Sequence, residues 1–147
     1  MSNIYYEDLV IGTKYDLGSY KLNRKSMINY AEKFDPQLIH IDESYAKSSL
    51  YKGIIASGWY TASIWMRLAC EGLLLNLQSM GSPGVENLKW LNPVRPGDTL
   101  SASLVIKDKR TSKSRPKLGI VTTTGDLTNQ NGNIVLTLKS SVFIKRK

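Results

Sequence analysis

The feature that most constrains the fold of this chain is an apolar segment at residues 62–75, interrupted mainly by Ser63, Arg67 and Glu71. The segment forms the centre of a long helix predicted over residues 57–77. A helix that is apolar on nearly every side has to be buried. Its polar interruptions make it a poor candidate for a membrane span. In a chain of 147 residues, only a sheet wrapped around this helix could cover it.

Two shorter helices are predicted before the long one. Asn23 is a suitable N-cap for a helix over residues 24–34, and Asp35-Pro36 ends it, because the residue before a proline is pushed out of the helical region. The apolar stripe of this helix consists of Met27, Tyr30, Ala31 and Phe34. A second short helix fits residues 42–48, with Asp42 as its cap.

The rest of the chain has the alternation and the β-branched residues that are typical of strands. Strands are predicted at residues 13–22, 84–91, 99–109, 118–127 and 134–144, with a hairpin turn at Asn131-Gly132. A basic stretch at residues 107–117 is predicted to be a long exposed hairpin loop. The order indicates an α+β plan, an antiparallel sheet wrapped around a central helix, which is the outline of a hot-dog fold. Residues 1–147 are predicted to form a single domain.

The charge of the chain is +8 and is concentrated in its second part. Residues 1–88 hold 8 Lys/Arg and 9 Asp/Glu, a net charge of −1, whereas residues 89–147 hold 12 and 3, a net charge of +9. A basic region attracts polyanions, so nucleic acid, coenzyme A or an acidic carrier protein could bind there, or the charge could simply be solvated. No basic motif interleaved with aromatic residues is present, so we predict no nucleic-acid partner.

The single cysteine, Cys70, excludes an internal disulfide and a cysteine metal cluster, and it fits a reducing cytoplasm. Its apolar neighbours predict a buried structural thiol. Residues 1–8 lack the basic start and the apolar run of a signal peptide. We therefore expect a cytoplasmic protein without a metal and without membrane attachment.

His40 is the only histidine, and Asp35 precedes it by five residues across a proline. An imidazole titrates near neutral pH, and a nearby carboxylate can share proton transfer with it. The two side chains could converge, although a structural histidine after a helix-ending Asp-Pro is the alternative.

Ser57-Gly58 opens the long helix. Its free amides carry positive character, and a glycine allows close approach to the backbone, so the Gly58 N–H could hold the oxyanion of a thioester. An ordinary Ser57 N-cap with a packing glycine is the alternative here. We expect Trp59, Tyr60 and Trp65 to make core or dimer contacts.

Together these elements resemble the MaoC-like, (R)-specific enoyl-CoA hydratase family. The loop of that family reads Asp-x-Asn-Pro-x-His, and Asp35 and His40 keep its spacing. Gln37 and Leu38 replace the usual Asn and Pro. Ser57-Gly58 matches the family's pair at the start of the central helix, and residues 90–100 resemble its following strand and turn.

The resemblance implies that Asp35 acts as a base, that His40 orients a water and donates a proton, and that the Gly58 amide polarises the thioester carbonyl. It implies no cofactor, an acyl-CoA or acyl-carrier-protein thioester as the partner, and a homodimer or a dimer of dimers. Gln37 and Ser57 are further candidates for substrate binding, and four basic residues are candidates for binding the phosphates or acidic surface of the carrier: Arg110, Lys113, Arg115 and Lys117.

Two alternatives keep the same fold. An acyl-CoA thioesterase would hydrolyse the thioester instead of hydrating the double bond, and a non-catalytic binder would hold the acyl thioester without turnover. The sequence leaves the acyl chain open, as well as the choice between coenzyme A and a carrier protein.

Overall fold

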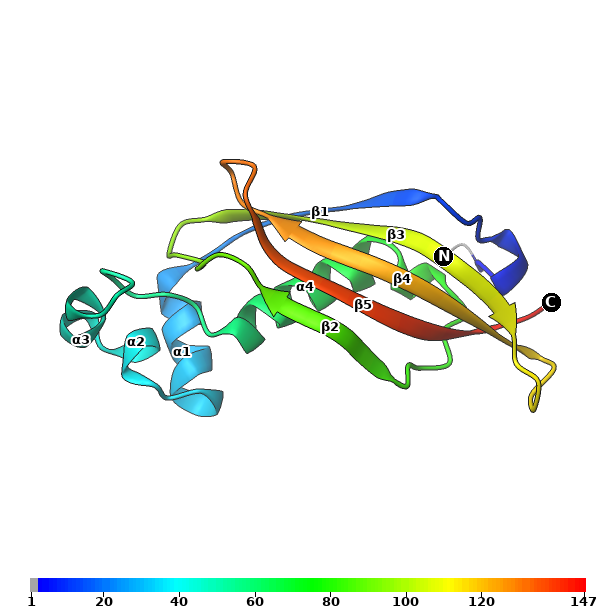
Figure 1. Cartoon of the computed structure of the whole chain (residues 1–147), viewed down its shortest axis with the longest axis horizontal. Coiled ribbons are helices and arrows are strands. Elements are labelled where there is room, and N and C mark those ends of the chain that lie inside the picture. The colour runs from blue at the N-terminus through cyan, green and yellow to red at the C-terminus, as the bar shows by residue number, and fades with distance from the viewer. Residues whose placement is uncertain (1–2) are drawn as a thin grey trace.

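The computed structural model describes residues 3–147, and within them five strands form one antiparallel sheet in the order β1-β3-β4-β5-β2. The sheet curves along one side of the helix α4 (Gly58–Gly72), and three shorter helices gather at one end of the molecule (Figure 1). This arrangement confirms the predicted hot-dog fold. The strands are β1 (Lys14–Lys21), β2 (Gly84–Trp90), β3 (Thr99–Thr111), β4 (Leu118–Thr128) and β5 (Ile134–Lys145).

The short helices begin where the sequence supplies caps. The Asn23 side chain accepts a hydrogen bond from the Ser26 N–H at the start of α1 (Arg24–Phe34), and Asp42 accepts one from the Tyr45 N–H at the start of α3 (Glu43–Ser48). Each bond satisfies an amide that has no partner within its helix. Both predicted caps are therefore confirmed. Single 3-10 turns lie at Tyr6–Asp8 and Leu74–Asn76.

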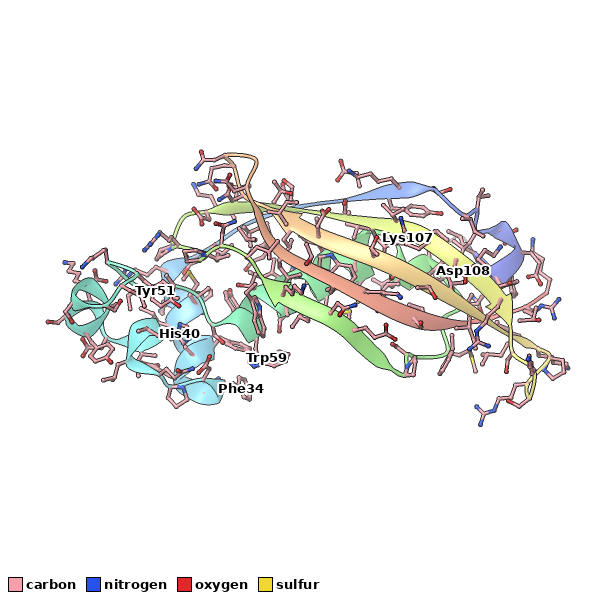
Figure 2. All side chains as sticks on the ribbon, viewed as in Figure 1. Phe34, His40, Tyr51, Trp59, Lys107 and Asp108 are labelled. Atoms are coloured by element: carbon pink, nitrogen blue, oxygen red, sulfur yellow. The ribbon has the colours of Figure 1, made fainter. Side chains whose placement is uncertain are left out.

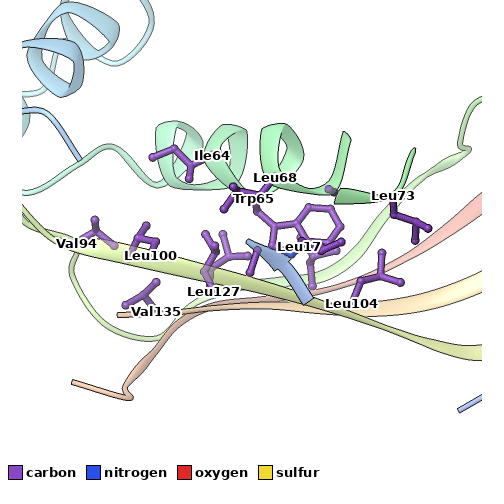
Figure 3. Close-up of a cluster of buried hydrophobic side chains, with 14 of the residues drawn as sticks. Leu17, Ile64, Trp65, Leu68, Leu73, Val94, Leu100, Leu104, Leu127 and Val135 are labelled. Carbon is purple, nitrogen blue, oxygen red and sulfur yellow. The ribbon is translucent and has the colours of Figure 1, made fainter. Parts of the chain in front are cut away.

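The core forms between α4 and the concave face of the sheet (Figure 3). Trp65 is the largest buried side chain of α4, and its indole nitrogen approaches the Ser103 carbonyl at 3.4 Å. A Cβ on Gly125 would lie 2.4 Å from the Trp65 ring, so only a glycine leaves space for this tryptophan. The buried residues of α4 are Thr61, Ile64, Trp65, Leu68 and Ala69.

The prediction for the long helix is wrong in two respects. The α-helix ends at Gly72 instead of at residue 77. At this end, Leu73 leaves the helical conformation and Gly72 packs against the Leu17 backbone. The sheet covers only one side of α4, so Trp59 and Met66 on its other side are 59% and 47% exposed. A single sheet layer cannot enclose a helix on all sides, and the apolar composition therefore overestimates its burial.

Other local predictions also need correction. The strand β3 continues to Thr111, paired with Gly119, so only residues 112–117 form the loop expected over residues 107–117. The apolar stripe predicted for α1 is buried only in part, since Met27 and Ala31 are buried whereas Phe34, the last residue of the helix, is 72% exposed. Cys70 is only partly buried. A one-turn helix, α2 (Leu38–Ile41), occupies what the sequence suggested to be a loop.

Candidate active site

His40 lies at the end of the molecule that carries the short helices (Figure 2), and the Asp35 side chain converges on it there. Asp35 follows the last residue of α1, and the single turn of α2 brings His40 back toward it. The His40 Nε2 atom lies 3.3 Å from the Asp35 Oδ2 atom. The structure thus brings together two residues predicted to act as a pair.

His40 has a defined orientation, because its ring is 6% exposed and its Nδ1 atom lies 2.8 Å from the Ile55 carbonyl oxygen. A carbonyl oxygen can only accept a hydrogen bond, so Nδ1 has to carry a proton. Nε2 is then the atom that faces Asp35, and it is the one available for proton exchange. Sequence reasoning missed Ile55, because a backbone carbonyl leaves no signature in residue type.

The Asp35 carboxylate accepts two side-chain hydrogen bonds besides its contact with His40. The buried Ser57 hydroxyl donates to Oδ2 at 2.6 Å, and the Gln37 amide donates to Oδ1 at 2.7 Å. Burial alone would raise the pKa of Asp35, but the bonds from Ser57 and Gln37 and the charge of His40 together hold that pKa below its ordinary value. Asp35 is therefore kept as a carboxylate at neutral pH.

Ser57 does not make the capping bond that the simpler interpretation of the sequence required. Its side chain points to Asp35 and makes no capping bond at the start of α4. The sequence separation of 22 residues explains why this contact could not be predicted from local patterns.

Gly58 begins α4 beneath the indole ring of Trp90. The Trp90 Nε1–H donates to the Gly58 carbonyl oxygen at 2.8 Å, and a Cβ on Gly58 would lie 2.5 Å from the ring. Glycine is therefore required here for the approach of a side chain of the same protein, whereas the sequence had suggested the approach of a ligand. The Gly58 N–H belongs to the first turn of the helix, which leaves it without a helical acceptor.

These groups border one cavity of about 450 Å³. Of the predicted site residues, Asp35, Gln37, His40 and Gly58 line it, while Ser57 lies behind Asp35. Sequence reasoning assigned no role in the site to several other lining residues, which include Tyr51, Thr61, Trp90 and Asn92. Trp90 and Asn92 fall in the segment that carried the family resemblance, and this was the available signal for them.

The four basic candidates lie elsewhere. Arg110 belongs to β3, and Lys113, Arg115 and Lys117 belong to the loop between β3 and β4. This loop is at the opposite end of the molecule from α1, α2 and α3 (Figure 1). One chain therefore does not bring these residues to the Asp35/His40 pair.

The described residues offer no group of three or more His, Cys, Asp or Glu side chains placed to share a metal ion. None of the described helices combines the length and the apolar character that a membrane crossing requires.

A family model described as the MaoC like domain matches residues 8–129, which is most of the chain. The chain belongs to the MaoC-like domain family. Among its relatives, the uncharacterized protein YdeM of Bacillus subtilis is 31% identical over 140 residues, covering 95% of this chain and 98% of YdeM. Membership of the MaoC-like family supports a role as a hydratase or dehydratase.

Two solved structures place this MaoC-like chain in context. A MaoC-like dehydratase from Rhodospirillum rubrum is 39% identical, with a TM-score of 0.90 and 98% coverage of both chains. The (R)-hydratase PhaJ1 from Pseudomonas aeruginosa is 21% identical, with a TM-score of 0.79 over 99% of this chain and 88% of PhaJ1. At this lower identity, the second comparison shows that the fold is shared.

Proposed function

We propose that this MaoC-like protein hydrates the C2–C3 double bond of an enoyl thioester and, in reverse, dehydrates the 3-hydroxyacyl thioester. The observation that carries the proposal is the Asp35/His40 pair, with Nε2 and Oδ2 only 3.3 Å apart, in a cavity that the start of α4 also borders. A base, a proton donor and a free backbone amide are the groups that this reaction requires. Residues 1–147 would act as one domain.

In the proposed reaction, the Asp35 carboxylate takes a proton from a bound water, and the water oxygen forms a bond to C3. His40, protonated on Nε2, orients the water and gives a proton to C2. Asp35 is ionised at neutral pH, as a base has to be before it can accept a proton, and the hydrogen bonds that lower its pKa also make it a weaker base than a free carboxylate. Proton exchange between Asp35 and His40 across their short separation would then restore both groups.

The Gly58 N–H would stabilise the negative charge that develops on the thioester oxygen. It lies at the N-terminal end of α4, where the helix dipole adds positive character. Its carbonyl oxygen is already held by Trp90, and this bond fixes the orientation of the first turn. Gln37 and Ser57 would act on the substrate indirectly, by keeping Asp35 in position.

The acyl carrier is either coenzyme A or an acyl carrier protein. Contact of the carrier with Arg110, Lys113, Arg115 or Lys117 would require a second copy of the chain, because these residues lie far from the pair within one chain. This fits the homodimer inferred from the family resemblance. Reversing all four charges should raise the KM for an acyl-CoA, and an unchanged KM would remove these residues from the proposal.

The test of the reaction type uses two thioesters. Purified protein mixed with crotonyl-CoA should remove the enoyl-thioester absorbance without releasing free thiol. With saturated butyryl-CoA, no thiol should appear. Thiol release from butyryl-CoA would instead identify a thioesterase, and tight binding of either thioester without turnover would identify a binder.

A further inference from the structure

A second cavity of about 420 Å³ lies beside the cavity of the Asp35/His40 pair, between α4 and the strands β2, β3, β4 and β5 of the sheet. Among the described residues that line the two cavities, Trp59 is the one that they share. The second cavity is mostly apolar, and its wall includes Ala62, Trp65, Met66, Val85, Leu88 and Leu138. Its volume lies in the range of small-molecule sites, about 300–1,000 Å³.

Two of the hydroxyl groups in the wall of this second cavity, those of Thr123 and Ser140, bond to each other instead of facing a ligand. They face each other across the pair β4 and β5, with their oxygens 3.0 Å apart. A mostly apolar wall of this kind favours an alkyl chain, because the burial of methylene groups away from water is favourable.

Trp59 stands between the two cavities and is loosely held. It projects from the first turn of α4 near β2 (Figure 2), and its side chain is 59% exposed. Its ring meets Trp90 edge to face, with centroids 5.3 Å apart. A single aromatic contact of this kind is weak, so the Trp59 ring can turn away at a modest cost. Trp90 is fixed by its bond to the Gly58 carbonyl oxygen and by its close packing on Gly58.

We propose that Trp59 sets the acyl-chain length of the substrate by separating the cavity of the Asp35/His40 pair from the apolar cavity beside it. A short enoyl group fits within the first cavity. A long one can enter the second cavity only if the Trp59 ring is displaced. This inference rests on the proposed hydratase function, and it makes the wild-type protein selective for short acyl groups.

The experiment compares kcat/KM for crotonyl-CoA and trans-2-decenoyl-CoA in the wild type, in Trp59→Ala and in Trp59→Phe. The wild type should prefer crotonyl-CoA, and Trp59→Ala should shift the ratio of the two values by about threefold to tenfold toward decenoyl-CoA, the range that a single aromatic contact supports. The Phe variant should shift it less, because a smaller ring still blocks part of the opening. Leu75→Ala is the matched control, since Leu75 is also an exposed apolar side chain near α4 and lines neither cavity.

Three results would overturn the assignment. The first is a ratio that Trp59→Ala leaves within twofold of the wild type while crotonyl-CoA is still turned over. The second is an equal shift in Leu75→Ala. The third is a change of oligomeric state in Trp59→Ala, measured by light scattering, with no change in the ratio, which would make the second cavity a contact surface for another copy. A wild type without activity on either thioester would refute the proposed function itself.

Discussion

Replacing Ser57 with alanine removes a hydroxyl that donates a hydrogen bond to the proposed base. Ser57 is fully buried and donates to the Asp35 Oδ2 atom at 2.6 Å, yet it does not line the cavity. A hydrogen bond to a charged group contributes about 1.5–3 kcal/mol. If the bond also orients Asp35 in the transition state, its loss should lower kcat/KM by between about tenfold and about 150-fold, at about 1.4 kcal/mol per factor of ten.

The loss should appear in kcat, with the KM for crotonyl-CoA nearly unchanged, because Ser57 makes no contact with the space that the substrate would occupy. The Ser57 bond also lowers the pKa of Asp35. Removing it raises that pKa, so the acidic limb of the pH profile of kcat/KM should move to higher pH.

The matched control is Ser63→Ala on the same helix, where the hydroxyl donates to the Trp59 carbonyl oxygen at 2.8 Å on the exposed side. Initial rates of absorbance loss from pH 4 to pH 9 would give both profiles. The account of Ser57 would be refuted by a folded Ser57→Ala protein with an unmoved acidic limb and a kcat/KM within twofold of the wild type.

Three further predictions follow from the close packing and the charge of the site. Gly125→Ala should lower the free energy of unfolding in urea by about 1–3 kcal/mol, because its Cβ would lie 2.4 Å from Trp65, and an unchanged midpoint would contradict this. Gly58→Ala should displace the Trp90 ring and reduce turnover in a protein that remains folded by circular dichroism, whereas full activity would argue against the proposed role of this amide. Because the pKa of Asp35 is lowered in the folded state, its charge stabilises the protein above the unfolded pKa of about 3.9, and this contribution is lost as the pH falls through the folded pKa. The stability difference between the wild type and Asp35→Asn in urea should therefore shrink as the pH is lowered from 7 to 3, and a constant difference would contradict the lowered pKa.

Much of the fold could be predicted because its signals are local. Asn23 and Asp42 cap helices through neighbours three residues away, and the strands show alternation over their own length. The Asp35/His40 pair could be predicted from the sequence for the same reason, since only a proline and one turn of helix separate the two residues.

The remaining features depend on contacts between segments that are distant in sequence. The bond from Ser57 to Asp35 and the packing of Trp90 on Gly58 join residues 22 and 32 positions apart. The exposure of Trp59 depends on how much of α4 the sheet covers, which composition does not report. The basic loop residues illustrate the same limit, because charge along the sequence does not reveal at which end of the molecule the charges lie.

The most direct test of the central claim is the rate of absorbance loss with crotonyl-CoA for the wild type, Asp35→Asn and His40→Ala. Asp108→Asn is the matched control, because Asp108 is an exposed carboxylate on β3 away from the pair (Figure 2). General acid–base catalysis contributes about 10²–10⁴-fold, so each of the two site variants should lose at least about 100-fold in kcat while the control keeps the wild-type rate. Turnover by the wild type that persists within tenfold in either Asp35→Asn or His40→Ala would contradict the assignment of these residues as its acid and base.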